Sequence, residues 1–344
     1  MKIVIITEGG KQIGFGHITR CVALGEAFEE KGIMPEFLVN GDEAVEDLLK
    51  DKKYLIFNWI KEKDKLFKII KAADIIIIDS YLAGKVLYDK ISKMVNGRLV
   101  MIDDYNRIAY PKGIVVNPSI YGEDLDYPKK EGVVYLSGND YTILRKEFWA
   151  NSNKRIRESI ESIMVTFGGN DTRNMTLRIL QYLNKSYPQL TKKVIIGKGF
   201  KNIKEIKKLQ NSRTELIYYP NAKEMKQEML KADIAISAGG QTLYELARIG
   251  VPTIAIAVVD NQLNNIKEWQ RVGFIEYAGR WEEARSLDTL AKKIDLLMDR
   301  HRRQKKSKTG KQKVDGKGAK RIYRLVVNRL ENISNGRFQI PVKN

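Results

Sequence analysis

His17, one of only two histidines in the chain, stands at the end of a glycine-rich turn and could accept a proton in catalysis. The apolar residues 3–6 before the turn predict a buried strand, and residues 21–28 after it have helical spacing. A strand, a turn and a helix in this order place His17 at a helix N-terminus. The partial positive charge there favours the neutral imidazole. We therefore expect His17 to be a neutral general base.

The same turn does not fit a nicotinamide-binding site. Gly14 and Gly16 lack the third glycine of the dinucleotide fingerprint, and the next predicted strand, 35–40, does not end in the acidic residue that binds the cofactor's ribose. A Walker-type phosphate loop does not occur in the sequence either. A capping or packing role for a lone histidine stays open as the alternative.

Polar side chains follow predicted strands in the first half of the chain. Residues 75–78 are four isoleucines, typical of a strand covered on both faces of a parallel sheet, and Asp79 and Tyr81 come directly after them. Asp103 and Asp104 follow the next apolar run. Because open α/β sheets bind ligands at the carboxyl ends of their strands, these side chains indicate one cleft. Either aspartate alone is more typical of a turn cap.

Two glycine pairs, Gly168–Gly169 and Gly239–Gly240, follow predicted strands in the second half, and each is expected to open a helix. Glycine lets a backbone approach closely, and a helix N-terminus favours phosphate. One such pair is typical of a tight turn, but two pairs favour a binding site for the diphosphate of a nucleotide. Glu245, in the second helix, could bind the ribose hydroxyls. The amides of Asn261 and Gln262 could bind a sugar or a phosphate without adding charge.

Strands and helices alternate in both halves, so the predicted fold is α/β, with two Rossmann-like, doubly wound domains facing a central cleft. We expect residues 1–152 to supply the base and the sugar or acceptor side, and residues 153–290 to bind the nucleotide. Residues 291–344 are expected to form a basic helical extension. Residues 135–149 are expected to be less regular.

The composition suits a globular protein of the cytoplasm. Of 344 residues, 43% are hydrophobic and 30% charged, which is ordinary for globular domains. The single cysteine, Cys21, excludes a disulfide framework and a cysteine-based zinc site. The N-terminus enters a strand without a signal peptide, and no apolar run approaches membrane-spanning length. We expect a cytoplasmic protein that needs no metal and no cofactor.

The formal net charge is +19, and much of it lies near the C-terminus. Residues 300–324 contain twelve Lys or Arg and one acid. We expect a basic loop here, between closing helices at 287–303 and 319–332. Such a segment suits an anionic acceptor or a membrane surface, and a solvated surface is the alternative. No nucleic-acid-binding motif accompanies it, so no nucleic acid is expected as a partner.

Seven motifs occur in order over most of residues 1–280. They are Gln12-Ile13-Gly14-Phe15-Gly16-His17-Ile18-x-Arg20, Ile78-Asp79-x-Tyr81, Asp103-Asp104, Tyr141-x-x-Leu144-Arg145-x-Glu147-Phe148, Phe167-Gly168-Gly169-x-Asp171, Ser237-Ala238-Gly239-Gly240-Gln241-Thr242-x-x-Glu245 and Asn261-Gln262. This set resembles the two-domain GT-B sugar-nucleotide enzymes. Within them it is similar to the UDP-2,4-diacetamido-2,4,6-trideoxy-β-L-altropyranose hydrolases of pseudaminic acid biosynthesis and their spore-coat polysaccharide relatives.

The resemblance implies a role for each matching residue. His17 would activate water at the anomeric carbon of a UDP-activated amino sugar, and Asn261 would lie at the sugar side. The substrate- and UDP-binding residues it implies are Gly14, Gly16, Arg20, Asp79, Tyr81, Gly168, Gly169, Asp171, Gly239, Gly240, Glu245 and Gln262. These hydrolases tend to carry arginine where this chain has Ile6 and aspartate where it has Glu8, which leaves the identity of the sugar open.

A nucleoside diphosphate is a stable leaving group, so the reaction needs little more than a base on the opposite face of the sugar. The expected activity is hydrolysis of a UDP-2,4-diacetamido-2,4,6-trideoxyhexose, with inversion, in nonulosonic acid or surface polysaccharide biosynthesis. The alternative is a GT-B glycosyltransferase that moves the sugar to a lipid or glycan acceptor, like the N-acetylglucosaminyltransferase of peptidoglycan synthesis. A third hypothesis is a module that binds a sugar nucleotide without turnover.

Overall fold

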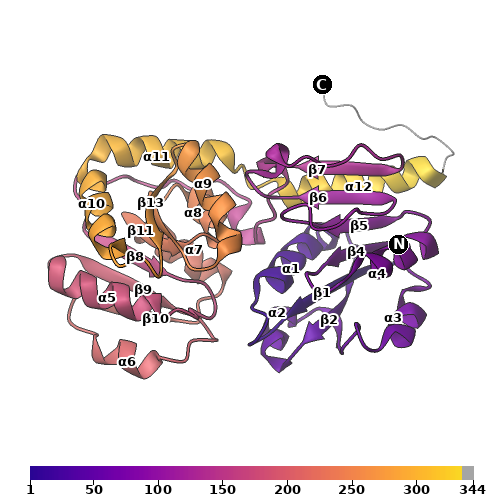
Figure 1. Cartoon of the computed structure of the whole chain (residues 1–344), viewed down its shortest axis with the longest axis horizontal. Helices are drawn as coiled ribbons and strands as arrows, with labels where there is room; N and C mark the ends of the chain where they lie inside the picture. The colour runs from indigo at the N-terminus through magenta and orange to yellow at the C-terminus, as the bar shows by residue number, and fades with distance from the viewer. Residues whose placement is uncertain (335–344) are drawn as a thin grey trace. The chain divides into compact units, whose positions relative to one another are not determined.

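The computed structural model describes residues 1–334 and divides into two compact units. The first unit contains Met1–Lys146 and the described residues from Lys317 onward, and the second is Glu147–Gly316. The first unit therefore combines the beginning of the chain with its last helix, drawn in yellow in Figure 1.

The first unit is built on a seven-stranded sheet in which all neighbouring strands are parallel. In spatial order its strands are β3 (Lys53–Ile56), β2 (Glu36–Gly41), β1 (Ile3–Gly9), β4 (Ile75–Asp79), β5 (Leu99–Ile102), β6 (Gly113–Asn117) and β7 (Val133–Ser137). Its helices are α1 (Gly16–Glu29), α2 (Glu46–Leu49), α3 (Lys63–Ile70), α4 (Lys85–Met94) and α12 (Gly318–Ser334). Single 3₁₀ turns occur at η1 (Glu43–Val45), η2 (Gly122–Asp124) and η3 (Asn139–Tyr141).

Strands β1 and β4 lie next to each other in the middle part of this sheet, and each contains a run of four apolar residues. All residues of β4 are buried, as the four consecutive isoleucines predict. The order of the strands changes direction between β1 and β4, because β2 and β3 lie on one side and β5 to β7 on the other. Ligands of open α/β sheets bind outside the carboxyl ends of the strands at such a switch point.

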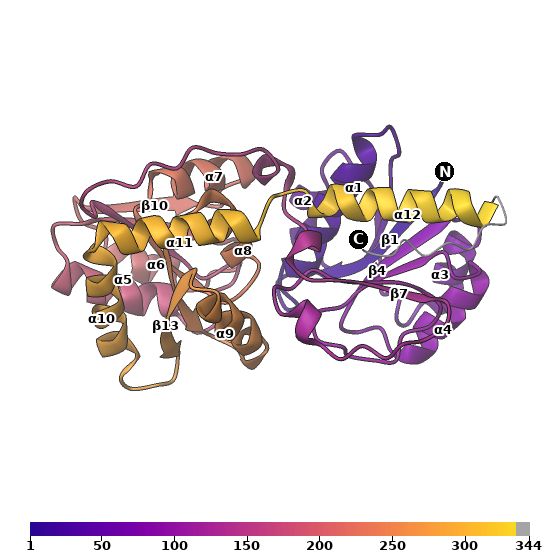
Figure 2. The same ribbon diagram turned by 90° about the horizontal axis from the view of Figure 1, so that it is seen from above.

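The last helix, α12, packs against α1 within the first unit (Figure 2). The rings of Tyr323 and Phe28 meet edge to face with centroids 5.1 Å apart. The Lys320 ammonium lies 2.7 Å from the Glu30 carboxylate at the end of α1. The helix at whose start His17 lies is thus braced at its other end by α12.

The second unit repeats the plan on a six-stranded parallel sheet. Its strands in spatial order are β10 (Thr214–Tyr218), β9 (Thr191–Ile196), β8 (Ser162–Thr166), β11 (Ile234–Ala238), β12 (Thr253–Ala257) and β13 (Ile275–Arg280). Its helices are α5 (Met175–Ser186), α6 (Ile203–Lys208), α7 (Ala222–Lys231), α8 (Thr242–Ile249), α9 (Leu263–Arg271), α10 (Ser286–Met298) and α11 (Arg300–Lys313), with the 3₁₀ turn η5 (Asp260–Gln262). The switch point lies between β8 and β11, the strands that precede the two glycine pairs.

The two parallel α/β sheets confirm the predicted fold class. Residues 135–149 are less regular, as expected, and contain the end of β7 and the 3₁₀ turns η3 and η4 (Lys146–Phe148). One local expectation is wrong. The expected basic loop is helix α11, which Asp299 caps by accepting a hydrogen bond from the His301 N–H at 2.8 Å. Hydrogen bonds from a basic side chain attach this polar helix to the second unit, because the fully buried Arg303 donates to two backbone carbonyls there.

The described helices, which end at residue 334, include none with both the length and the apolarity required to cross a membrane.

Candidate active site

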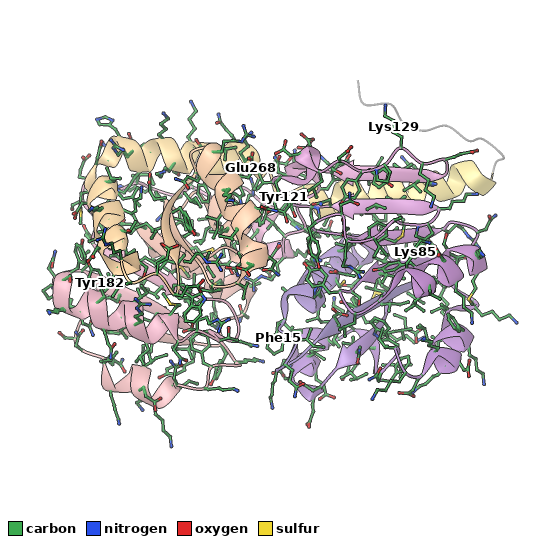
Figure 3. The ribbon with its side chains drawn as sticks, in the orientation of Figure 1. Phe15, Lys85, Tyr121, Lys129, Tyr182 and Glu268 are labelled. Atoms are coloured by element: carbon green, nitrogen blue, oxygen red, sulfur yellow. The ribbon has the colours of Figure 1, made fainter. Side chains whose placement is uncertain are left out.

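The glycine-rich turn after β1 is held by its own backbone. Gly10 and Gly14 exchange two backbone hydrogen bonds of 3.0 and 2.8 Å, which closes the turn before α1 begins at Gly16. A side chain at Gly10 would lie 2.6 Å from an oxygen of Asp42, whereas the positions at Gly14 and Gly16 are open. Figure 3 labels Phe15, the residue before α1. The turn therefore fixes the first residues of α1 at the carboxyl end of β1, beside the switch point.

His17 has one ring nitrogen engaged and the other available. Its Nδ1 lies 2.7 Å from Oδ1 of Asp79, the last residue of β4. A carboxylate only accepts hydrogen bonds, so Nδ1 carries a proton, and in the neutral ring Nε2 keeps its lone pair. Among the residues that the structure describes, none hydrogen-bonds Nε2, and the carboxylate oxygen Oε1 of Glu8 lies 3.9 Å from it. Asp79 thus orients the ring as a base.

The position of His17 at a helix N-terminus led us to expect a lowered pKa and a neutral ring, but the pKa is raised. Burial lowers the pKa of His17, but the charge and the hydrogen bond of Asp79 outweigh it, so the pKa lies above 6.5. The Arg20 charge opposes this rise, and Asp104 adds to it. His17 is therefore a stronger base than a free imidazole, and it stays protonated up to a higher pH.

Arg20 joins the carboxylates of two strand ends. Its Nε and Nη2 lie 2.5 and 2.6 Å from the two oxygens of Asp79. Its Nη1 and Nη2 lie 2.7 and 3.0 Å from the two oxygens of Asp104, and the Tyr81 hydroxyl donates to Asp104 as well. Although burial raises the pKa of the Asp79 carboxyl, the adjacent Arg20 and His17 hold it well below its usual range. The structure thus brings His17, Arg20, Asp79 and Tyr81 together.

Glu8 belongs to this cluster but was not predicted as a site residue, whereas Asp104 was expected at the cleft without a binding role. Glu8 is 1% exposed and accepts hydrogen bonds from the Ser80 hydroxyl and, at 2.8 Å, from the Tyr81 N–H. An acidic residue inside a buried strand is uncommon, and that signal could have identified Glu8. Asp103 is the turn cap expected of one aspartate of the pair, since it accepts from the N–H of Asn106 at 2.6 Å.

In the second unit, the pair Gly168–Gly169 shapes an open loop, but α5 does not begin there. Gly168 has a φ of +76°, which favours glycine, and no atom lies within 4 Å of the position of a side chain. Helix α5 begins only at Met175, where Asp171 accepts from the N–H groups of Met175 and Thr176, each at 2.8 Å. Asp171 therefore caps this helix with both carboxylate oxygens.

The second pair differs in the space around each glycine. A side chain at Gly239 would lie 2.5 Å from Ile266, so this glycine is required by packing. At Gly240 the nearest atom would be Nε2 of Gln262, 3.9 Å away. The side-chain oxygen of Gln262, Oε1, accepts hydrogen bonds from the N–H groups of Gly239 and Val258 at 3.1 and 3.2 Å. Gln262 thus holds the turn, and the open position is that of Gly240.

Glu245 and Asn261 lie in the same unit with contrasting exposure. Glu245 is in the first turn of α8 and is 4% exposed, so it is not an ordinary surface glutamate. Asn261 is exposed in η5, beyond β12. Within residues 1–334, no group of three or more His, Cys, Asp or Glu side chains could hold a metal ion.

The comparisons with known proteins agree with this architecture. Residues 162–322 match the glycosyltransferase family 28 C-terminal domain. The chain is 24% identical over 341 residues to the spore coat polysaccharide biosynthesis protein SpsG of Bacillus subtilis, covering 96% of this chain and 99% of that protein. It is 25% identical to the UDP-2,4-diacetamido-2,4,6-trideoxy-beta-L-altropyranose hydrolase of Campylobacter jejuni, and the match covers 80% of this chain and 99% of that protein. A Methanocaldococcus jannaschii protein is 26% identical over 74% of this chain, which spans only 55% of that protein.

Two solved structures share the fold at low identity. MurG of Acinetobacter baumannii aligns with a TM-score of 0.65 and 15% identity, covering 95% of this chain and all of that one. The MnaA–UDP co-structure from Staphylococcus aureus aligns with a TM-score of 0.65 and 15% identity, covering 100% and 99%. The resemblance drawn from the motifs is thus confirmed at the level of distant homologues. The chain has a GT-B-like fold, matches the glycosyltransferase family 28 C-terminal domain over residues 162–322, and is a distant homologue of SpsG and of the diacetamido-sugar hydrolase.

Proposed function

We propose that this protein hydrolyses a UDP-activated 2,4-diacetamido-2,4,6-trideoxyhexose to UDP and the free sugar. Water attacks the anomeric carbon with inversion, in nonulosonic acid or surface polysaccharide biosynthesis. The distant homology to the Campylobacter hydrolase supports this class of substrate.

The observation that carries the proposal is the state of His17. Its Nδ1 is held by the buried Asp79 at 2.7 Å, so in the neutral ring the unshared electron pair is on Nε2. Nε2 removes a proton from water while the water oxygen bonds to the anomeric carbon. The bond from that carbon to the diphosphate oxygen breaks, and its electron pair leaves with UDP. The imidazolium formed is stabilised by Asp79 and later loses its proton to solvent.

The second unit supplies the UDP site in this proposal. The open positions at Gly168 and Gly240 give backbone N–H groups room to approach the diphosphate. Glu245 binds the ribose hydroxyls, and Asn261 contacts the sugar. Asp171 and Gln262 act through the turns they hold, since their oxygens accept backbone N–H groups. The UDP in the MnaA structure is consistent with a nucleotide on this fold.

A glycosyltransferase is the second candidate, and helix α11 favours it. Its exposed side chains include Arg302, Lys305 and Lys308, on a helix that contains no acidic residue. Such a face attracts an anionic lipid or a polyphosphate-linked acceptor by about 1 kcal/mol per cation near the surface. In this alternative His17 takes the proton of an acceptor hydroxyl instead of water.

The experiment is UDP release from a panel of UDP-diacetamido-trideoxyhexoses without an acceptor, comparing wild type with His17→Ala. The control is His301→Ala, because His301 is the other histidine of the chain and lies exposed on α11. Release that is lost with His17 and kept without His301 supports hydrolysis. Tight UDP binding without release would favour the transferase, and full release by His17→Ala would leave the base assignment wrong.

A further inference from the structure

We infer that Glu8 and His17 together select water as the nucleophile, which makes Glu8 a specificity-determining residue for the reaction. This inference rests on the proposed hydrolase function. It concerns the choice between water and an alcohol, which the assignment of the base alone leaves open.

The geometry that points to Glu8 is the spacing of two acceptors. Oε1 of Glu8 lies 3.9 Å from Nε2 of His17, which is too long for a direct hydrogen bond. A spacing of this size suits one bridging water, with its oxygen about 2.8 Å from each acceptor. Nε2 is the nitrogen that takes the proton, so a water in this position is the attacking one.

Local hydrogen bonds hold Glu8 in this orientation. Its Oε2 accepts from the Ser80 hydroxyl, and its Oε1 accepts from the Tyr81 N–H at 2.8 Å. The Ser80 oxygen in turn accepts from the N–H groups of Leu82 and Ala83, each at 2.9 Å, which directs its own proton to Glu8. Glu8 is 1% exposed, so the carboxylate has little freedom to turn away.

Two acceptors that converge on one oxygen distinguish water from alcohols. Water has two O–H groups and can donate to Nε2 and to Oε1 at the same time. An alcohol, including a sugar hydroxyl, has one O–H group, so it can donate to Nε2 but leaves the Glu8 side of the site facing a carbon. Each buried hydrogen bond that is lost costs about tenfold in a rate or an equilibrium.

The test is a partition experiment with methanol as the probe alcohol. The UDP-sugar that the wild type turns over is incubated in buffer with methanol, and free sugar and methyl glycoside are quantified by mass spectrometry. In methanolysis the methanol oxygen bonds to the anomeric carbon, its proton goes to Nε2, and UDP leaves with the bonding pair. The ratio of the two products does not depend on how much enzyme is folded.

We expect Glu8→Ala to raise the ratio of methyl glycoside to free sugar about tenfold over wild type. Glu8→Asp, which shortens the side chain by one methylene, gives an intermediate ratio. The control Glu36→Ala removes a buried glutamate at the start of β2, the neighbouring strand, and leaves the ratio unchanged.

The failures of the two proposals are distinguishable. An unchanged ratio in Glu8→Ala, with UDP release still dependent on His17, would overturn the role of Glu8 and leave the hydrolase proposal intact. If Glu8→Ala makes no product, the ratio in Glu8→Asp decides in the same way. A wild type that releases no UDP from any sugar of the panel would overturn both.

Discussion

Replacing Asp79 with Asn tests the physical basis of the site, because it removes one charge and preserves the size of the side chain. Three N–H donors lie on the Asp79 oxygens: Nδ1 of His17 at 2.7 Å, and Nη2 and Nε of Arg20 at 2.6 and 2.5 Å. An asparagine NH₂ group on either side of the amide faces at least one Arg20 donor. The substitution therefore turns an attraction into a conflict between donors.

The structure sets the expected loss of folding stability and the expected loss of catalytic rate. Removing one partner of a buried ion pair costs about 3–5 kcal/mol. Arg20 keeps its two hydrogen bonds to Asp104, so we expect about 3 kcal/mol, the lower end of that range. In catalysis His17 loses the group that fixes its tautomer. We expect kcat/KM for UDP release to fall by about 10²–10⁴, or about 3–5 kcal/mol in the barrier.

The assay measures kcat/KM for UDP release together with the folded fraction by circular dichroism at the assay temperature. The matched control is Asp74→Asn, because Asp74 precedes the opposite end of β4 and accepts from the backbone N–H of Lys2 at 2.7 Å. We expect the control to lose some stability and to keep its rate. A rate within threefold of wild type for Asp79→Asn, or a loss that matches the unfolded fraction, would refute the reasoning.

Three further predictions follow from the site. Because the pKa of His17 is raised and the base must be neutral, activity should fall as the pH drops through a midpoint above 6.5 in the pH profile of kcat/KM; a midpoint below 6.5 would contradict the role of Asp79. Glu245→Ala should weaken UDP binding at least tenfold by calorimetry, while Glu205→Ala, an exposed control on α6, should not; equal affinities would remove Glu245 from the ribose site. UDP release should persist in EDTA, and a loss restored by added metal would show that the reaction needs a cation.

The proximity of His17, Asp79 and Tyr81 was predictable from the sequence because it depends on short-range patterns. Four isoleucines define β4, a glycine-rich turn ends β1, and the carboxyl ends of parallel strands share one edge of a sheet. The partners of Arg20 were not predictable in this way. Asp79 and Asp104 are 59 and 84 residues away from it, and no local pattern specifies those pairs.

The expectations that failed depended on contacts that the sequence does not display. The pKa of His17 rises because of Asp79, whose charge was absent from an argument based on the helix dipole alone. The polar segment 300–313 folds as α11 because Arg303 and Lys306 reach backbone carbonyls of the second unit. The edge strand β7 was not predicted, although four of its five residues, Val133–Leu136, form an apolar run, so the sequence did contain a signal for this strand.

The most direct test of the central claim is UDP release by wild type and His17→Ala from UDP-diacetamido-trideoxyhexoses, with water as the only nucleophile. The account predicts fast release by the wild type and a loss of about 10²–10⁴-fold in the variant, with UDP affinity unchanged. Equal rates for the two proteins would contradict it.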